Sequence, residues 1–219
     1  MSQRFSCDDE DDLTRGIEAA TTAVRSGRLV VLPTDTVYGV GADAFDAAAV
    51  HRLLRAKGRG RDMPPPVFIA ARTTLDALAT NLPMYARELV AALWPGPLTL
   101  VCRQQPSLTW DLGDNRSTVA IRMPDSEPAL RLVQATGPLA VSSANISGQP
   151  PATLVEEAQE MLGESVAVYL DGGASPGDTA STILDVTGPT GRVLRRGPVP
   201  LERLREFDER IQPVEEPAG

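Results

Sequence analysis

The 219-residue sequence contains only one histidine and two cysteines, and aromatic residues make up 4% of it. Cys7 and Cys102 follow no ligand spacing, so the sequence predicts neither a zinc site nor a disulfide framework. No cluster of His, Cys, Asp and Glu has metal-ligand spacing, and His51 lies on the polar side of an expected helix. We therefore expect no protein-bound metal and no histidine-activated nucleophile.

Long apolar runs are also missing, so we expect no membrane-spanning segment. The start of the chain is acidic from Asp8 to Asp12, the opposite of a secretory signal, and a cytoplasmic location is the default expectation. The net charge of -8 argues against a generally basic surface that wraps nucleic acid, although it allows a local basic cleft.

The usual nucleotide-binding motifs are weak or absent. The P-loop pattern does not occur, so a nucleoside triphosphate would have to be bound in another way. Residues 39–44 match the dinucleotide pattern G-x-G-x-x-A, but they follow the preceding apolar run only after Pro33 and a polar segment. Because that pattern requires its glycines at a tight turn from strand to helix, coincidence is the better interpretation.

The most informative stretch runs from Arg28 to Arg61. It begins with branched apolar residues 29–32, typical of a strand buried on both faces. A loop rich in hydroxyls and carboxylates follows, and Asp46 then precedes a helical pattern of apolar residues. That helix runs out into Lys57, Gly58 and Arg59. The polar loop therefore precedes the helix and a cationic cluster follows it.

Further apolar runs alternate with helical patterns along the chain, which predicts one large α/β domain. We expect a flexible acidic lead at residues 1–12, a catalytic-type domain at 13–210 and a flexible tail at 211–219. The loops at residues 34–38, 142–147 and 178–181 follow expected strands, where open α/β sheets usually bind ligands.

Cations near the ends of expected elements complete this pattern. Three of them, Lys57, Arg59 and Arg61, lie within five residues, and Arg122 and Arg195 follow later strands. Such side chains bind polyphosphates or carboxylates, so we expect an anionic ligand and cations exposed to its cleft. Asp35 is expected either to accept a proton or to turn its loop, with the structural role favoured.

Five segments in order resemble one known family. They are Pro33-Thr34-Asp35-Thr36-Val37-Tyr38-Gly39, Lys57-Gly58-Arg59, Thr118-Val119-Ala120-Ile121-Arg122-Met123-Pro124, Ser143-Ala144-Asn145-Ile146-Ser147-Gly148 and Ser181-Thr182-Ile183-Leu184-Asp185. Together, over about residues 13 to 200, the chain closely resembles the YrdC-type threonylcarbamoyl-AMP synthases. The resemblance implies a twisted open mixed sheet with flanking helices and a large concave cationic cleft.

It also implies a nucleotidyltransferase reaction. Members of that family join L-threonine, bicarbonate or CO2, and ATP into threonylcarbamoyl-AMP and pyrophosphate. The threonylcarbamoyl-AMP is then used to modify an adenosine of tRNA. We accordingly expect ATP as a substrate, with Mg2+ carried on its phosphates. The expected partners are the machinery that transfers threonylcarbamoyl to tRNA and, weakly, tRNA itself, with no membrane.

The resemblance assigns roles to matching positions. The expected catalytic residues are Lys57, Arg59, Ser143 and Asn145. The same four residues, with Thr118 and Arg195, are expected to bind ATP. Thr36, Arg122 and Ser181 are expected around threonine, and no residue is expected to ligate a metal.

The chain departs from the family pattern between Gly60 and Phe68, where an asparagine and a histidine of many members are missing. Two alternatives stay open. The first is a non-catalytic RNA-binding module, in which Arg55, Lys57, Arg59 and Arg61 would bind the RNA backbone. The second, suggested by the displaced glycines, is a nicotinamide or flavin enzyme.

Overall fold

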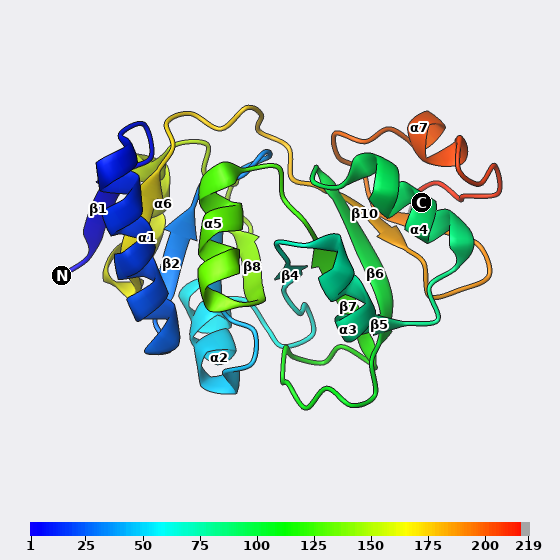
Figure 1. Ribbon diagram of the computed structural model, residues 1–219, viewed down its shortest axis with the longest axis horizontal. Helices are drawn as coiled ribbons and strands as arrows, with labels where there is room; N and C mark the ends of the chain where they lie inside the picture. The colour runs from blue at the N-terminus through cyan, green and yellow to red at the C-terminus, as the bar shows by residue number, and fades with distance from the viewer. Residues whose placement is uncertain (216–219) are drawn as a thin grey trace.

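The computed structural model describes residues 1–215 and shows one continuous mixed β-sheet across the whole molecule (Figure 1). The strands follow the order β1-β9-β2-β3-β8-β4-β7-β6-β10-β11, and β5 pairs with β6 off this path. The strands are β1 (Gln3–Ser6), β2 (Leu29–Leu32), β3 (Gly39–Asp43), β4 (Val67–Phe68), β5 (Ala79–Thr80), β6 (Leu98–Gln104), β7 (Thr118–Arg122), β8 (Leu139–Ser143), β9 (Val166–Asp171), β10 (Thr182–Asp185) and β11 (Arg192–Arg195). Parallel and antiparallel pairs alternate irregularly, as the expected open mixed sheet requires.

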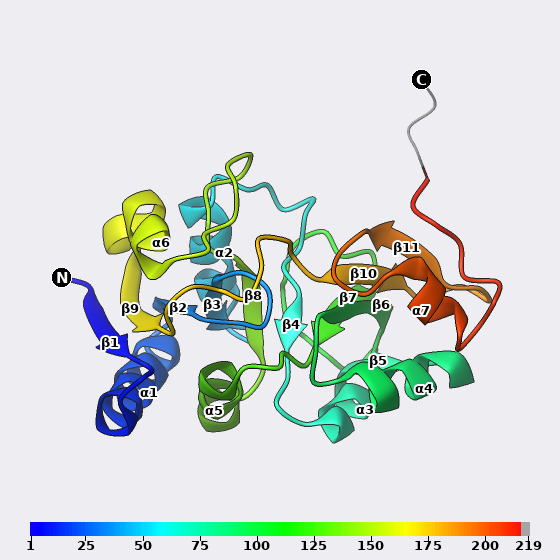
Figure 2. The ribbon, with the colours of Figure 1, turned by 90° about the horizontal axis from the view of Figure 1, so that it is seen from above.

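Helices cover both faces of this sheet (Figure 2). Helices α1 and α5 pack together on one face, and α2 and α6 lie on the other. The helices are α1 (Glu10–Arg25), α2 (Ala47–Ala56), α3 (Leu75–Leu78), α4 (Met84–Leu93), α5 (Glu127–Thr136), α6 (Val155–Leu162) and α7 (Leu201–Arg205), with short 3-10 turns at Arg72–Thr74 and Gly163–Ser165. The layered arrangement confirms the predicted α/β class.

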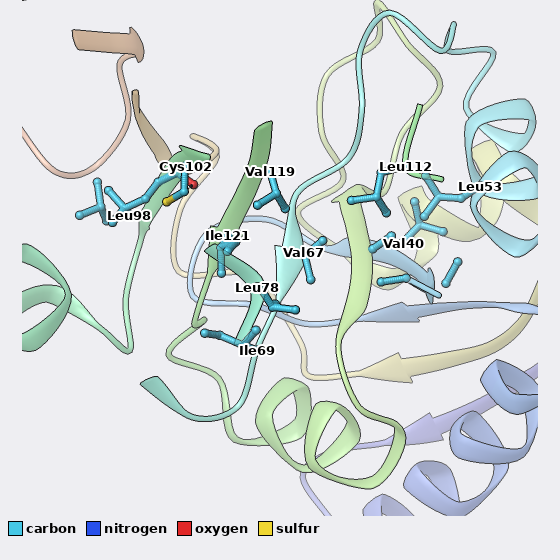
Figure 3. Packing of buried hydrophobic residues seen from close by; sticks show 14 of the residues in the cluster. Val40, Leu53, Val67, Ile69, Leu78, Leu98, Cys102, Leu112, Val119 and Ile121 are labelled. Carbon is cyan, nitrogen blue, oxygen red and sulfur yellow. Dashed lines mark hydrogen bonds between the residues drawn. The ribbon is translucent and has the colours of Figure 1, made fainter. Parts of the chain in front are cut away.

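Strand β2 is buried on both faces, as its run of branched apolar residues predicts. Val30 and Leu32 pack under α1 and α5, whereas Leu29 and Val31 belong to the larger core on the opposite face. That larger core continues along the sheet toward β6. Figure 3 shows part of it, with Val40 of β3 and Cys102 of β6 among the labelled side chains. The buried hydrophobic area on both sides therefore holds the sheet as one unit.

Helix α2 begins where the sequence indicates. The Asp46 side chain accepts hydrogen bonds from the backbone N–H groups of Ala48 and Ala49, at 2.9 and 3.1 Å, and so caps the helix. Val50, Leu53 and Leu54 form its buried face. The helix ends at Ala56, which delivers Lys57 and Arg59 to the centre of the molecule.

The segment after the polar loop is a strand, where the sequence analysis placed only a loop with displaced glycines. Gly39 and Gly41 lie inside β3, which pairs antiparallel with β2 and β8. A Cβ atom at Gly39 would lie 2.7 Å from a methyl carbon of Val141, so the close approach of β8 requires glycine there. Because these glycines are not at a turn from strand to helix, they form no dinucleotide fingerprint.

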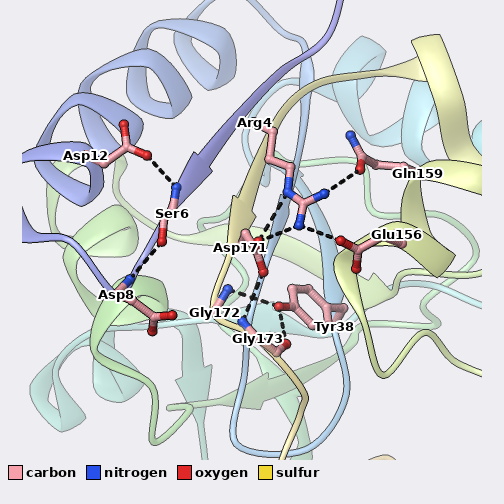
Figure 4. A network of polar contacts seen from close by, with 10 residues as sticks. All are labelled: Arg4, Ser6, Asp8, Asp12, Tyr38, Glu156, Gln159, Asp171, Gly172 and Gly173. Atoms are coloured by element: carbon pink, nitrogen blue, oxygen red, sulfur yellow. Dashed lines mark hydrogen bonds and ion pairs between the residues drawn. The ribbon is translucent and has the colours of Figure 1, made fainter.

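The first residues also differ from the flexible lead that we expected. Gln3–Ser6 form β1, which pairs parallel with β9, and α1 begins at Glu10 with Asp9 as its cap. Figure 4 shows why this edge strand is held: Arg4 donates to Asp171 at 2.6 and 3.2 Å and also reaches Glu156. The acidic residues predict a flexible segment, but backbone pairing with β9 and the Arg4 side chain hold it at the sheet edge.

The expected flexible tail is partly anchored. Ile211 is fully buried, and Gln212 exchanges backbone hydrogen bonds of 2.9 Å with Gly191 and Val193. The remainder of the predicted tail, residues 216–219, lies outside the described residues. Within residues 1–215, no helix combines the length and apolar character needed to cross a membrane.

Candidate functional site

A cavity in the middle of the sheet collects residues from segments far apart in the sequence. The loop between β2 and β3 forms one wall, and β7, β8, β10 and β11 contribute others. Seven of the nine predicted site residues line it, namely Thr36, Arg59, Thr118, Arg122, Ser143, Ser181 and Arg195. The remaining two, Lys57 and Asn145, lie directly behind this lining.

Arg122 ends strand β7 and is only 4% exposed. Its Nε donates to the carbonyl of Gly96 at 3.1 Å, its Nη1 to Thr36 Oγ1 at 3.1 Å, and its Nη2 to Asp35 Oδ1 at 2.6 Å. The guanidinium also lies over the ring of Phe68, with Cζ 5.6 Å from the ring centroid. The polar loop therefore fixes the orientation of an arginine that the sequence places almost ninety residues away.

This arrangement leaves Arg122 with donors for a ligand. A guanidinium carries five N–H groups, and within the described chain three of these have the acceptors given above. One N–H on each of Nη1 and Nη2 remains, the number that a single carboxylate binds in bidentate fashion. Burial lowers the pKa of Arg122 and the neighbouring Asp35 opposes this shift.

The hydroxyl of Thr36 has a defined direction. Thr34 Oγ1 donates its one proton to the Val37 carbonyl at 2.7 Å, so in the 3.0 Å contact between the two hydroxyls Thr36 is the donor. Thr36 Oγ1 meanwhile accepts from Arg122. Both threonines are buried, and the loop therefore presents a fixed polar surface rather than a mobile one.

Arg195 and Ser181 also meet at the cavity. Arg195 donates from Nε to the Ser181 carbonyl at 2.9 Å and from Nη2 to Ser181 Oγ at 3.0 Å. Ser181 Oγ also contacts Thr99 Oγ1 at 2.8 Å. Burial lowers the pKa of Arg195, and repulsion from Arg122 and Arg59 lowers it further.

Arg59 completes a group of three arginines at the cavity. Its Nη1 donates to Ser142 Oγ at 3.1 Å, whereas its buried Nε has no hydrogen-bond partner. Burial lowers the pKa of Arg59 as well. The described lining contains these three arginines and no carboxylate, so an anion would relieve both their mutual repulsion and the unpaired donor.

Lys57 lies elsewhere than we expected. We predicted a side chain exposed to the cleft, but Lys57 is only 1% exposed. Its Nζ donates to the carbonyls of Ser143 and Asn145 at 2.5 and 2.7 Å and to Asn145 Oδ1 at 3.1 Å. All three ammonium donors are therefore used on the loop after β8. Burial, with repulsion from Arg59, lowers the Lys57 pKa from 10.5 to about 8.

Asn145 supports the same loop from within. Its Nδ2 donates to the carbonyls of Ile146 and Gln149 at 2.9 and 2.7 Å. The backbone of Ser147 donates to the Lys57 carbonyl at 2.8 Å, which ties the loop back to the end of α2. Lys57 and Asn145 thus hold Ser143 at the cavity wall in this structure.

The segment in which the chain departs from the family pattern forms a wall of the cavity. Pro64, Pro65, Pro66 and Phe68 line it, together with Leu112 and Asn115 from the irregular loop before β7. The sequence analysis did not predict these residues as part of the site. Phe68 belongs to an apolar run typical of a buried strand, which gives no sign of a site, and the loop before β7 lacks helical or strand periodicity.

A salt bridge joins these two segments on the outside. Arg61 pairs with Asp111 at 2.8 Å and with Asp114 at 3.5 Å, and its carbonyl accepts from the Asp114 N–H. Gly113, at a φ of +116°, lets the chains approach, because a Cβ there would lie 2.6 Å from the Arg61 carbonyl oxygen. Arg61 therefore supports the wall and does not face the ligand cavity.

This placement of the cations bears on the RNA-binding alternative. Lys57 is buried, Arg59 lines the cavity and Arg61 pairs with carboxylates, so the four expected cations form no continuous exposed face. Only Arg55 of that group is exposed without an ion pair among the described residues. The geometry therefore favours a small anionic ligand over an RNA backbone.

Comparison with known proteins agrees with this geometry. The Sua5_yciO_yrdC family model, described as "Telomere recombination", matches residues 22–197. A protein of Mycobacterium tuberculosis, provisionally named a threonylcarbamoyl-AMP synthase, is 54% identical over 206 residues, which are 94% of this chain and 95% of the relative.

Longer relatives are similar to the chain over part of their length. The threonylcarbamoyl-AMP synthase of Pyrococcus abyssi is 39% identical over 201 residues, 90% of this chain and 59% of the relative. The crystal structure of P. abyssi Sua5 complexed with L-threonine superposes with a TM-score of 0.90 at 36% identity, covering 97% of this chain and 62% of that one.

Proposed function

Because the chain belongs to the Sua5/YciO/YrdC family, we propose that it is a threonylcarbamoyl-AMP synthase, which converts L-threonine, bicarbonate or CO2, and ATP into threonylcarbamoyl-AMP and pyrophosphate. One observation carries the proposal: the three residues expected at threonine and four of the six expected at ATP line a single cavity. The relatives named above and the threonine complex of P. abyssi Sua5 support it.

Threonine would bind at Arg122. The two remaining N–H groups of its guanidinium suit the α-carboxylate, and Thr36 and Ser181 offer hydroxyls nearby. Because Thr36 and Ser181 are themselves held by Arg122 and Arg195, the pocket is preorganised before a ligand enters.

The triphosphate would bind toward Arg59 and Arg195, with Thr118 and Ser143 on the same wall. The α-amine of threonine would first lose a proton to solvent and add to CO2 with release of a second proton, which forms the N–C bond of threonine carbamate. The carbamate would then attack the α-phosphate: a bond forms between a carbamate oxygen and phosphorus, and the bond to the bridging oxygen breaks as pyrophosphate leaves. The arginines would neutralise the charge that builds up on the leaving group. No side chain has to remove a proton in this step, because the attacking carbamate is already an anion.

Lys57 and Asn145 would act from behind this wall. By holding the loop after β8 they would fix Ser143, and the ammonium charge would add to the field at the phosphates. Mg2+ would neutralise phosphate charge and would arrive bound to ATP, since such an ion needs few protein ligands. The adenylate would pass to the machinery that modifies tRNA.

The proposal is tested by incubating the purified chain with ATP, Mg2+, L-threonine and labelled bicarbonate. We expect pyrophosphate and a labelled adenylate that form together and only when threonine is present. Arg195→Ala should reduce this product at least tenfold without loss of fold. Pyrophosphate release that does not depend on threonine, or no labelled adenylate, would contradict the proposed function.

A further inference from the structure

Thr99 is a fully buried polar residue at the cavity to which the sequence assigns no role. It lies in β6, beside β10, and it is among the residues that line the cavity. Its Oγ1 lies 2.8 Å from Oγ of Ser181, the residue just before β10. Within residues 1–215 this hydroxyl makes no other hydrogen bond, so Ser181 is its one partner there.

The contact between these two hydroxyls has a defined direction. A hydroxyl carries one proton and two lone pairs. If Ser181 donated to Thr99, the Thr99 proton would be buried without an acceptor, which is costly. Ser181 lies at the cavity wall, where its own proton can reach a ligand. Thr99 is therefore the donor and Ser181 the acceptor.

This direction leaves Ser181 with only its proton to offer. Its Oγ accepts from Thr99 and also from Arg195 Nη2, at 3.0 Å, so both lone pairs are occupied. Two donors on one hydroxyl oxygen polarise its O–H group and strengthen it as a donor. Thr36 is the converse, because it gives its proton to Thr34. The two hydroxyls expected at threonine therefore have opposite polarity.

We propose that Thr99 is a positioning residue, which donates to Ser181 and so directs the Ser181 O–H group to an acceptor oxygen of the threonine substrate. The carboxylate, the side-chain hydroxyl and, once formed, the carbamate of that substrate supply such oxygens. The α-ammonium does not, because it has no lone pair. This inference rests on the proposed function, since Ser181 is expected at threonine in that reaction.

The test measures L-threonine binding to the full chain by calorimetry, without ATP. Thr99→Val keeps the shape of the side chain and removes its hydroxyl, and threonine should bind it about three- to tenfold more weakly than wild type. Thr99→Ser keeps the hydroxyl and should bind threonine within about twofold of wild type. In a chain that already carries Ser181→Ala, adding Thr99→Val should change the affinity less than about twofold, because Thr99 acts only through Ser181.

Thr182→Val is the matched control, because it removes a buried threonine hydroxyl that does not contact Ser181. The Thr182 hydroxyl donates to the Val199 carbonyl at 2.9 Å and accepts from the Val199 N–H at 3.0 Å. Its removal should lower the Tm, whereas the affinity for threonine should stay within about twofold of wild type. The comparison separates a positioning role of Thr99 from a general loosening of β6 and β10.

Four outcomes would overturn the inference. Wild-type affinity in Thr99→Val would show that the hydroxyl is not needed, and tighter binding would show that Ser181 donates to Thr99. An equal loss in Thr99→Ser or Thr182→Val would show loosening, and a further severalfold loss on adding Thr99→Val to Ser181→Ala would show a separate role.

If Thr99→Val does not fold, Thr99→Ala gives the same comparisons. A wild-type chain that does not bind threonine would refute the threonine subsite, and with it the proposed function. If the wild-type chain binds threonine and Thr99→Val binds it equally well, only the role of Thr99 is refuted.

Discussion

Replacing Lys57 by methionine is expected to weaken the fold as well as the reaction, contrary to what an exposed cleft lysine would do. Methionine has a similar length but no donor, so it fills the same space and removes the donor from the three acceptors of Lys57. The carbonyl and the side-chain oxygen of Asn145 then have no other partner among the described residues, whereas the Ser143 carbonyl keeps the hydrogen bond of 3.0 Å from the Asn145 N–H. The substitution therefore tests what holds the loop after β8.

The size of the effect follows from two opposing contributions. Leaving a buried acceptor unpaired costs about 1–3 kcal/mol, and the two Asn145 acceptors at about 2 kcal/mol each amount to about 4 kcal/mol. Against this, the fall of the Lys57 pKa from 10.5 to about 8 corresponds to about 3 kcal/mol that the buried charge costs the folded state. The net loss is about 1 kcal/mol, or a drop in Tm of about 2–4 °C.

Thermal and urea unfolding of Lys57→Met against wild type measure this loss, and the adenylate assay measures activity, which should fall at least a hundredfold. Arg55→Met is the matched control, since Arg55 is an exposed cation on the same helix and its loss should change stability by less than about 0.5 kcal/mol. A Lys57→Met chain with the wild-type Tm would refute the reasoning, because the three Nζ bonds would then contribute nothing to stability.

The remaining predictions concern pH and the support of the cavity. The folded pKa of Lys57, about 8, lies below the unfolded value of 10.5, so the stability that Lys57 contributes grows as pH rises through this window. The difference in Tm between wild type and Lys57→Met should therefore widen from pH 8 to about 10. Over the same range, adenylate formation by the wild type should fall as Lys57 loses its charge. A difference in Tm that stays constant would count against the shifted pKa. Tyr38→Phe removes the hydroxyl that donates to the Gly173 carbonyl at 2.6 Å and accepts from the Gly172 N–H at 3.0 Å, and urea unfolding should show a loss of about 1–3 kcal/mol. Gly113→Ala forces a Cβ against the Arg61 carbonyl and should displace this wall of the cavity, which should raise the KM of at least one substrate; equal KM values in variant and wild type for both substrates would show that the wall contacts neither.

Local structure was largely predictable where one segment determines its own conformation. The branched run at residues 29–32 is buried on both faces, and Asp46 caps the helix that it precedes. These features depend on side-chain chemistry within a few residues, which the sequence displays directly. Arg122 and Arg195 were expected to meet an anionic ligand from the ends of their strands, and both line the cavity.

Strand β3 and edge strand β1 were not predictable in this way. Gly39 has poor strand propensity, but it lies in a strand that pairs with β2 on one side and with β8 on the other, and Val141 of β8 leaves no room there for a side chain. The acidic N-terminal residues are ordered because they pair with β9 and Arg4 binds Asp171 there. Strands β8 and β9 are about a hundred residues or more away in the sequence, so no local pattern reports these contacts.

By itself, the sequence determined the class of fold, the family and the types of side chain that meet an anionic ligand. Only the tertiary structure decided which of those side chains face the ligand. Lys57 and Arg59 are two residues apart and look equivalent in sequence, yet Lys57 is buried against carbonyls while Arg59 lines the cavity. The reason is physical: an ammonium or a guanidinium binds whichever acceptors the fold brings within about 3 Å, and those acceptors lie on loops that only the assembled sheet brings together.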